Sequence, residues 1–216
     1  MNKEKRILIL KKFEIFYMNA TTELKYNTSF ELLIAIILSA QSSDTQVNNV
    51  TKQLFSKVSR PSDILKLGLL KLKKILRTIG LFNKKAEYIM NTCRLLANVF
   101  NESIPLNINQ LLRLPGVGRK TANLFLNIVL KKKYIAVDTH VFRVSNRTGF
   151  ATGASVGIVE KKLHRVVPSE FKLYIHAWFV IHGRYVCIAK KPKCLKCVIN
   201  HVCEYFYKNF NYISKK

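Results

Sequence analysis

The hydrophobic positions along this chain recur mostly at helical spacing. From Asn83 to Phe100, apolar residues return at steps of three and four, which is the period of one helix face, and Asn83 is a suitable N-cap. A similar period runs over residues 69–79 and again after Gly118. Residues 32–38 are apolar without a break. These segments predict several helices, each with a buried face.

Polar residues at the predicted helix starts support this interpretation. Thr28 precedes Glu31 by three positions, and Ser43 precedes Gln46 in the same way, so both segments carry a capping-box pattern. Pro61 suits the first turn of a further helix. No run longer than residues 134–137 has the character of a strand. The sequence therefore predicts an all-α fold.

Composition and charge narrow the class of protein. The chain has 216 residues, of which 49% are hydrophobic, and this excludes a disordered basic tail. Its 37 Lys and Arg residues against 12 Asp and Glu residues give a net charge of +25. A charge of that size repels itself and indicates a polyanionic partner. Much of the excess is Lys, which biased genomic base composition also produces.

The apolar segments and the N-terminus predict a cytoplasmic protein. The apolar run at residues 32–38 is far shorter than the ~18 residues that a membrane span needs. The first residues contain no cleavable apolar core, so we expect no signal peptide.

The basic turn at residues 131–133 is the predicted seam between two lobes.

The glycine pair in L-P-G-V-G-R-K-T-A is the first candidate site. Gly116 and Gly118 flank Val117 between two helical patterns, which exposes backbone N–H groups at a helix start and could hold a phosphate. The glycine spacing is wrong for a Walker A loop, and Thr121 stands where a dinucleotide fingerprint needs its third glycine. An ordinary corner between two helices is the alternative.

Lys120 lies in the first turn of the helix that follows these glycines. The core face of that helix centres near Ala122 and Phe125, and Lys120 points roughly 150° away from it. The helix dipole and the neighbouring Arg119 both favour the neutral amine that a nucleophilic lysine requires, whereas DNA phosphates would oppose it. A simple phosphate contact is the alternative, and the pattern alone favours it.

Asp138 follows a short apolar run and precedes another helical pattern, in A-V-D-T-H-V. It can be the N-cap of that helix, an acid beside a reactive amine, or both. His140 and Arg143 lie one helical turn apart and could face the same cleft, or could belong to a solvated helix face.

Four of the five cysteines crowd into one short segment near the C-terminus. Without a secretory signal, this crowding favours a metal centre over disulfides. The spacing does not choose between tetrahedral zinc and a four-iron cluster, since both accept four Cys ligands. Cys93 lies on an apolar helix face and is predicted to be in the core. The four candidate ligands are Cys187, Cys194, Cys197 and Cys203.

These motifs, in this order, resemble the endonuclease III family of bacterial DNA glycosylases in the helix-hairpin-helix superfamily. The resemblance covers essentially the whole chain, including L-L-I-A-I-I-L-S-A-Q. It implies a six-helix barrel lobe over residues 22–132, with the hairpin at about 108–130. It also implies a cluster lobe made of residues 1–21 and 133–216, whose loop 187–203 holds the cluster. Duplex DNA would lie in the groove between the lobes, bound by a monomer.

The resemblance also implies roles for individual residues. Lys120 matches the nucleophile and Asp138 the catalytic carboxylate, while the four cysteines match the ligands of a [4Fe–4S] cluster. Ser145 departs from the Cys expected in a close relative. The residues that would contact DNA are Gln41, which fills the gap left by the flipped base; Leu81, which wedges into the opposite strand; Gly116, Val117 and Gly118, which grip phosphate; and Arg119, His140, Arg143 and Lys191.

The implied reaction removes a damaged pyrimidine from duplex DNA. Lys120 would attack C1′ of the sugar, and the resulting Schiff base would allow β-elimination to cut the strand 3′ to the lesion. A mismatch-specific adenine glycosylase is one alternative, although that family typically lacks the lysine and carries a further C-terminal domain. A non-catalytic, metal-stabilised DNA-binding protein is another, but it gives Lys120 and Asp138 no shared role.

Overall fold

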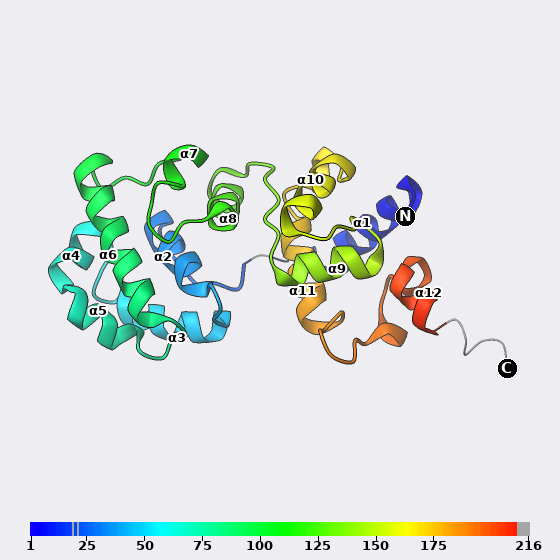
Figure 1. The fold of residues 1–216 in the computed structure, drawn as a ribbon, viewed down its shortest axis with the longest axis horizontal. Coiled ribbons are helices and arrows are strands. Elements are labelled where there is room, and N and C mark those ends of the chain that lie inside the picture. Colours follow the sequence, from blue (N-terminus) through cyan, green and yellow to red (C-terminus); the bar gives the residue numbers. More distant parts are fainter. Residues whose placement is uncertain (19, 21, 211–216) are drawn as a thin grey trace. The chain divides into compact units, whose positions relative to one another are not determined.

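The computed structural model of the chain describes residues 1–18, 20 and 22–210. The described residues form helices and turns without a strand, so the predicted all-α fold is confirmed (Figure 1). The short run at residues 134–137, which came nearest to a strand pattern, belongs to no helix or strand. The chain forms two compact units, namely Thr22–Lys132 and a composite unit of Met1–Thr21 with Lys133–Lys216.

The 22–132 unit is organised around one apolar helix. Helix α2 is buried on every side from Phe30 to Leu38, because its sequence there is almost entirely apolar. It packs against α3, α6 and α8. The helices of this unit are α2 (Ser29–Ser39), α3 (Asp44–Phe55), α4 (Pro61–Leu67), α5 (Leu69–Leu76), α6 (Phe82–Val99), α7 (Ile108–Leu111) and α8 (Arg119–Leu130).

The predicted helix starts are largely confirmed. Ser43 and Gln46 form a reciprocal capping box at the start of α3. Thr28 caps α2 by accepting the N–H of Glu31, but the Glu31 carboxylate accepts from the N–H of Asn27 rather than from Thr28. Pro61 opens α4 as expected.

The predicted start of α6 is wrong by two residues. The helix begins at Phe82, and its N-cap is Leu81 rather than Asn83. Leu81 has a φ of 58°, in the left-handed region, and its side chain makes no capping hydrogen bond. Helix α6 therefore begins after a left-handed turn and without a side-chain cap. Capping propensity alone does not predict such a helix start.

The composite unit brings the N-terminal helix together with the part of the chain after residue 132. Ile9, Leu10 and Phe13 of its first helix pack into one core with Trp178 and Phe179, far away in the sequence. The helices of this unit are α1 (Lys3–Phe16), α9 (Thr139–Thr148), α10 (Val156–Val166), α11 (Ile175–Tyr185) and α12 (Glu204–Phe210), with the short 3₁₀ turns η1 (Ser169–Phe171), η2 (Cys194–Lys196) and η3 (Asn200–Val202).

The described helices include none with the length and apolar character that crossing a membrane requires. The most apolar of them, α2, has 11 residues and is instead the centre of its unit.

Two buried hydroxyls on α9 predict opposite mutational effects. Among the described residues, Ser145 Oγ has no hydrogen-bond partner, whereas Thr148 Oγ1 donates to the carbonyl of Val144 at 2.7 Å. Ser145→Ala removes an unsatisfied polar group, so we expect the free energy of unfolding to stay the same or rise by about 1 kcal/mol. Thr148→Val removes a bonded hydroxyl and should lower it by about 1–2 kcal/mol. Urea denaturation of both variants measures the difference, and a loss in Ser145→Ala as large as that in Thr148→Val would contradict the prediction.

Candidate functional site

The glycine-rich segment forms a tight turn between α7 and α8. The N–H of Val117 donates to the carbonyl of Leu114 at 3.0 Å, and Thr92 Oγ1 of α6 donates to the carbonyl of Pro115 at 2.7 Å. Val117 is buried, whereas Gly118 is exposed and begins α8 without a side-chain cap. The turn is therefore anchored from α6 while the backbone at the start of α8 is left accessible, which suits a phosphate.

Gly116 is required by the geometry of this turn. Its φ is 80°, and a Cβ added there would lie 2.9 Å from Cβ of Tyr88. Gly118 differs, because it has an ordinary φ of −87° and no atom within 4 Å of an added Cβ. The two glycines thus have different roles. Gly116 permits the conformation of the turn, whereas Gly118 leaves open space above the helix start.

Lys120 and Arg119 are both exposed in the first turn of α8, while Ala122 and Phe125 of the same helix are fully buried. This agrees with the orientation that helical geometry predicts for Lys120. The amine is thus accessible directly behind the hairpin turn, in the 22–132 unit.

Two exposed residues of the 22–132 unit stand in left-handed backbone conformations. Gln41, in the turn between α2 and α3, has a φ of 56°, and Leu81, before α6, has a φ of 58°. The Leu81 side chain is 60% exposed. The two turns are neighbours, because a Cβ added at Gly80 would lie 3.3 Å from the carbonyl oxygen of Gln41. Such strained, exposed positions are typical of functional sites.

Asp138 is the N-cap of α9 in the composite unit. Its Oδ1 accepts the N–H of Val141 at 2.7 Å. This capping contact is one of the two compatible roles that the sequence indicates, and it fixes the carboxylate on rigid backbone at a partly exposed position.

His140 and Arg143 are half-buried in the composite unit rather than part of a solvated face. Arg143 donates to the carbonyls of Gly183 and Cys187 at 2.8 and 3.0 Å, and its Nη2 lies 3.2 Å from Nδ1 of His140. Burial, together with the charges of Arg143 and Arg184, lowers the pKa of His140, although the Asp138 carboxylate acts in the opposite direction. Arg143 therefore orders the segment that leads into the cysteine loop, and its contact with DNA stays a prediction.

Arg147 contacts the start of the cysteine loop, which the sequence analysis did not predict. It donates to the carbonyls of Ile188 and Ala189 at 2.7 and 2.8 Å, and its Nη1 lies 3.8 Å from Sγ of Cys187. The available signal was its position one turn after Arg143 on the same helix, since residues four apart share a helix face. Together the two arginines hold the backbone at the start of the cysteine loop.

The four loop cysteines are unpaired thiols that act electrostatically on one another. Burial, together with the neighbouring Cys203, Cys187 and Cys194, raises the pKa of Cys197 to about 12. Its Sγ lies 3.7 Å from Nε2 of buried His182. Burial likewise raises the pKa of Cys203 and Cys194. Thiols that disfavour ionisation in each other's presence fit a bound cationic centre, which stabilises thiolates.

The cysteine loop has two further features. In the described part of the chain, no three His, Cys, Asp or Glu side chains are grouped so as to hold a single metal ion. Lys191 is exposed and has a φ of 51°, within a loop whose Lys190 and Lys193 are also exposed.

Cys93 is fully buried on α6, as predicted for a core residue.

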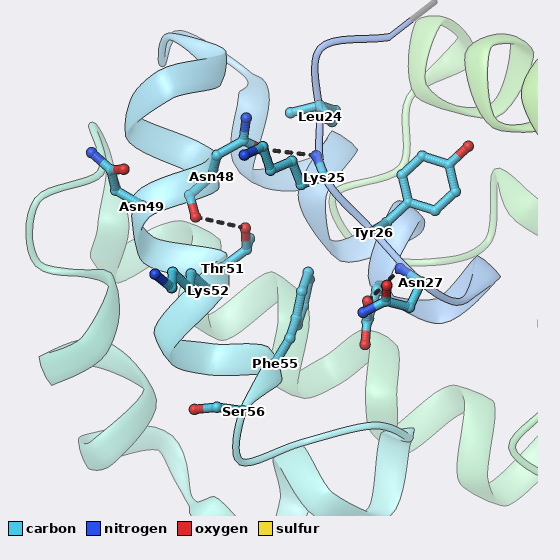
Figure 2. Close-up of a pocket in the computed structure, with 11 residues that line it drawn as sticks. Leu24, Lys25, Tyr26, Asn27, Asn48, Asn49, Thr51, Lys52, Phe55 and Ser56 are labelled. Atoms are coloured by element: carbon cyan, nitrogen blue, oxygen red, sulfur yellow. Dashed lines mark hydrogen bonds between the residues drawn. The ribbon is translucent and has the colours of Figure 1, made fainter.

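A cavity of about 800 Å³ lies beside α3 in the 22–132 unit (Figure 2). Asn48 shapes it by accepting the N–H of Lys25 at 2.9 Å and donating to the carbonyl of Glu23 at 2.8 Å. Phe55 and Thr51 of α3 also line it. None of the predicted site residues is among the residues that line this cavity.

Comparison with known proteins agrees with the fold and the hairpin. The model of the HhH-GPD superfamily of base excision DNA repair proteins matches residues 34–169. Endonuclease III of Haemophilus influenzae is 54% identical over 205 residues, which are 95% of this chain and 97% of that protein. Endonuclease III of Escherichia coli K12 is 50% identical over the same shares. A solved structure of a trapped endonuclease III–DNA covalent intermediate, an estranged-adenine complex, has a TM-score of 0.92 at 40% identity and covers 96% of this chain and 98% of that chain.

The helical fold with its hairpin thus defines a base excision DNA repair protein of the HhH-GPD superfamily. Within that superfamily the chain belongs to the endonuclease III family. It is an enzyme of the DNA glycosylase and AP lyase class. This membership favours neither the mismatch-specific adenine glycosylase nor the non-catalytic DNA-binding protein.

The two glycines of the hairpin predict a difference in stability. Gly116→Ala forces a side chain into the left-handed region and against Tyr88, so the free energy of unfolding should fall by about 1–3 kcal/mol. Gly118→Ala meets nothing and should leave stability within about 0.5 kcal/mol of wild type. Chemical denaturation compares the two variants, and equal losses in both would show that the turn does not depend on Gly116.

Proposed function

We propose that this enzyme excises oxidised pyrimidines from duplex DNA through a covalent intermediate on Lys120, and then cleaves the strand 3′ to the resulting abasic site. The observation that carries the proposal is the exposed Lys120 amine, in the first turn of α8 directly after the hairpin, in a chain of the endonuclease III family. A monofunctional glycosylase would use water and would need no such amine.

The proposed chemistry requires one lysine for both activities. The neutral Nζ of Lys120 forms a bond to C1′ of the sugar while the bond from C1′ to the base breaks, and the base leaves with that electron pair. Opening of the sugar ring then gives a Schiff base, which acidifies the hydrogen on C2′. Loss of that proton breaks the bond from C3′ to its oxygen, so the strand is cut on the 3′ side.

Asp138 assists this chemistry in the proposal. Its carboxylate takes up the proton that the attacking amine loses and stabilises positive charge that develops on the sugar. The capping contact with Val141 holds the carboxylate at a fixed helix start. A cap and an acid are thus two uses of one side chain.

The remaining predicted contacts would hold the DNA and the extruded nucleotide. The open backbone at Gly118 receives a phosphate, Gln41 fills the gap left by the flipped base, and Leu81 enters the opposite strand. The exposed side chains of Arg119 and Lys191 add phosphate contacts that weaken as salt rises. His140 and Arg143 complete this surface. We propose that one chain suffices, so that the enzyme acts as a monomer on duplex DNA in the cytoplasm.

The four loop cysteines would hold a [4Fe–4S] cluster. Four free thiols within one loop, at a position ordered by Arg143 and Arg147, supply the ligand set that such a cluster needs. When bound, the cluster would tie the loop that carries Lys190 and Lys191 to a rigid centre. The role of these residues is then to present positive charge at a fixed position.

Borohydride trapping tests the role of Lys120. With a duplex that carries thymine glycol or an abasic site, wild type should form a covalent complex that reduction makes permanent. Lys120→Ala should reduce trapping to background, because the amine that forms the Schiff base is gone. Lys131→Ala, which removes an exposed lysine at the other end of α8, is the matched control and should trap like wild type.

Chemical denaturation and an excision assay together distinguish the two roles of Asp138. Asp138→Asn keeps an oxygen that can cap α9 but removes the charge, so stability should change by less than about 1 kcal/mol while excision falls at least 100-fold. An Asp138→Asn variant that excises normally would refute the role of Asp138. Likewise, a Lys120→Ala variant that traps as well as wild type would refute the role of Lys120.

Iron content and colour test the metal centre. Purified protein should be brown, absorb in the visible range and contain about four iron atoms per chain. Cys194→Ala should lower the iron content and DNA affinity together, whereas Cys93→Ala, which removes a cysteine of the 22–132 core, should keep the iron. A colourless protein with one zinc per chain would contradict the cluster.

A further inference from the structure

Lys85 is a buried lysine that the proposed chemistry does not use. It lies in the first turn of α6 and is 4% exposed. Its Nζ donates to the carbonyl of Leu38 at 2.8 Å and to Oγ of Ser42 at 3.0 Å. Lysine is almost never fully buried without a specific partner, and burial lowers the pKa of this amine. A buried lysine with two defined acceptors therefore calls for a structural or functional reason.

The two acceptors belong to the turn that carries Gln41. Leu38 lies in the last turn of α2, where backbone carbonyls have no partner within the helix, and Ser42 lies in the loop before α3. Gln41 stands between these two contact points, with its φ of 56°. Lys85 thus holds the turn on both sides of a residue in a strained conformation.

Lys85 is also bonded to the turn that carries Leu81. Its own backbone N–H donates to the carbonyl of Leu81 at 3.0 Å, which is the first hydrogen bond of α6. Leu81 has no capping side chain, so this backbone bond ties the Leu81 turn to the helix. Between the two turns, Gly80 approaches the carbonyl of Gln41 so closely that an added Cβ would lie 3.3 Å from it.

We propose that Lys85 is a positioning residue that sets the spacing between Gln41 and Leu81, the two residues that replace the extruded base and hold the opposite strand apart. The inference rests on the proposed roles of Gln41 and Leu81 and assigns the device that holds them. One residue joins both turns, its backbone bound to Leu81 and its side chain bound on either side of Gln41. The ammonium reaches these acceptors from the core, so the exposed side chains stay free to enter DNA.

The role of Lys85 predicts which substrates are sensitive to its loss. Extrusion of a paired base costs unstacking and unpairing energy, and this cost is least for a base that has no partner. A misplaced Gln41 or Leu81 should therefore slow excision of a paired lesion and spare a lesion opposite an abasic-site analogue. A general loss of stability would affect both substrates equally.

The experiment measures single-turnover excision on two duplexes. In one, thymine glycol lies opposite adenine; in the other, it lies opposite a tetrahydrofuran analogue of an abasic site. Three variants are compared with wild type. Lys85→Met keeps the aliphatic stem but removes the amine, and excision of the paired lesion should fall roughly 10- to 100-fold. Its rate on the unpaired lesion and its borohydride trapping at a preformed abasic site should stay within about threefold of wild type. Lys84→Met, which removes the adjacent exposed lysine of α6, is the matched control and should leave the ratio of the two rates unchanged.

Ser42→Ala keeps Lys85 and removes one acceptor, so it should shift the ratio in the same direction by a smaller factor. It decides the question if Lys85→Met does not fold. Equal losses on both duplexes, or a Lys85→Met ratio equal to that of Lys84→Met, would overturn the role of Lys85. A wild-type protein that neither excises nor traps would instead refute the proposed function itself.

Discussion

Every helix leaves backbone N–H groups unpaired at its start and carbonyls unpaired at its end, and the functional parts of this chain lie where those groups must be satisfied. The start of α8 has no side-chain cap and is exposed beside Lys120. The start of α9 is capped by Asp138. The end of α2 receives the Lys85 amine, and the carbonyls at the end of α11 receive Arg143. A carboxylate, a buried lysine and a half-buried arginine thus satisfy three of these helix ends, and a phosphate is our proposal for the start of α8.

Only part of the +25 charge is available to a polyanionic partner. The cations of Lys85 and Arg147 are directed at backbone carbonyls within the protein, at 2.7–2.8 Å, so they contribute to the arrangement of the site rather than to a DNA-facing surface. Lys120 and Lys191 are exposed and remain available to a polyanion. Net charge indicates a class of partner, but hydrogen bonds determine which cations can meet it.

The sequence predicted more of the fold than of the contacts in the site. Periodicity and capping gave most helices of the 22–132 unit, the start of α3 at Asp44 and the core position of Cys93, because these depend on neighbours within a few residues. The start of α6 was misplaced because Leu81 adopts a left-handed conformation that its residue type disfavours. The tasks of Arg143 and Arg147 were missed because their acceptors lie about forty residues further along the chain.

The sequence by itself determined most helices of the 22–132 unit, the glycine turn before Lys120, the cap at Asp138 and the spacing of the four cysteines, because each is a local pattern of residue types. The family likeness follows from the order of those patterns. Only the tertiary structure decided that Lys85 is buried across two turns and that Arg147 binds the cysteine loop. The reason is physical: a long cationic side chain reaches solvent or a buried carbonyl equally well, and packing between distant segments selects one of them.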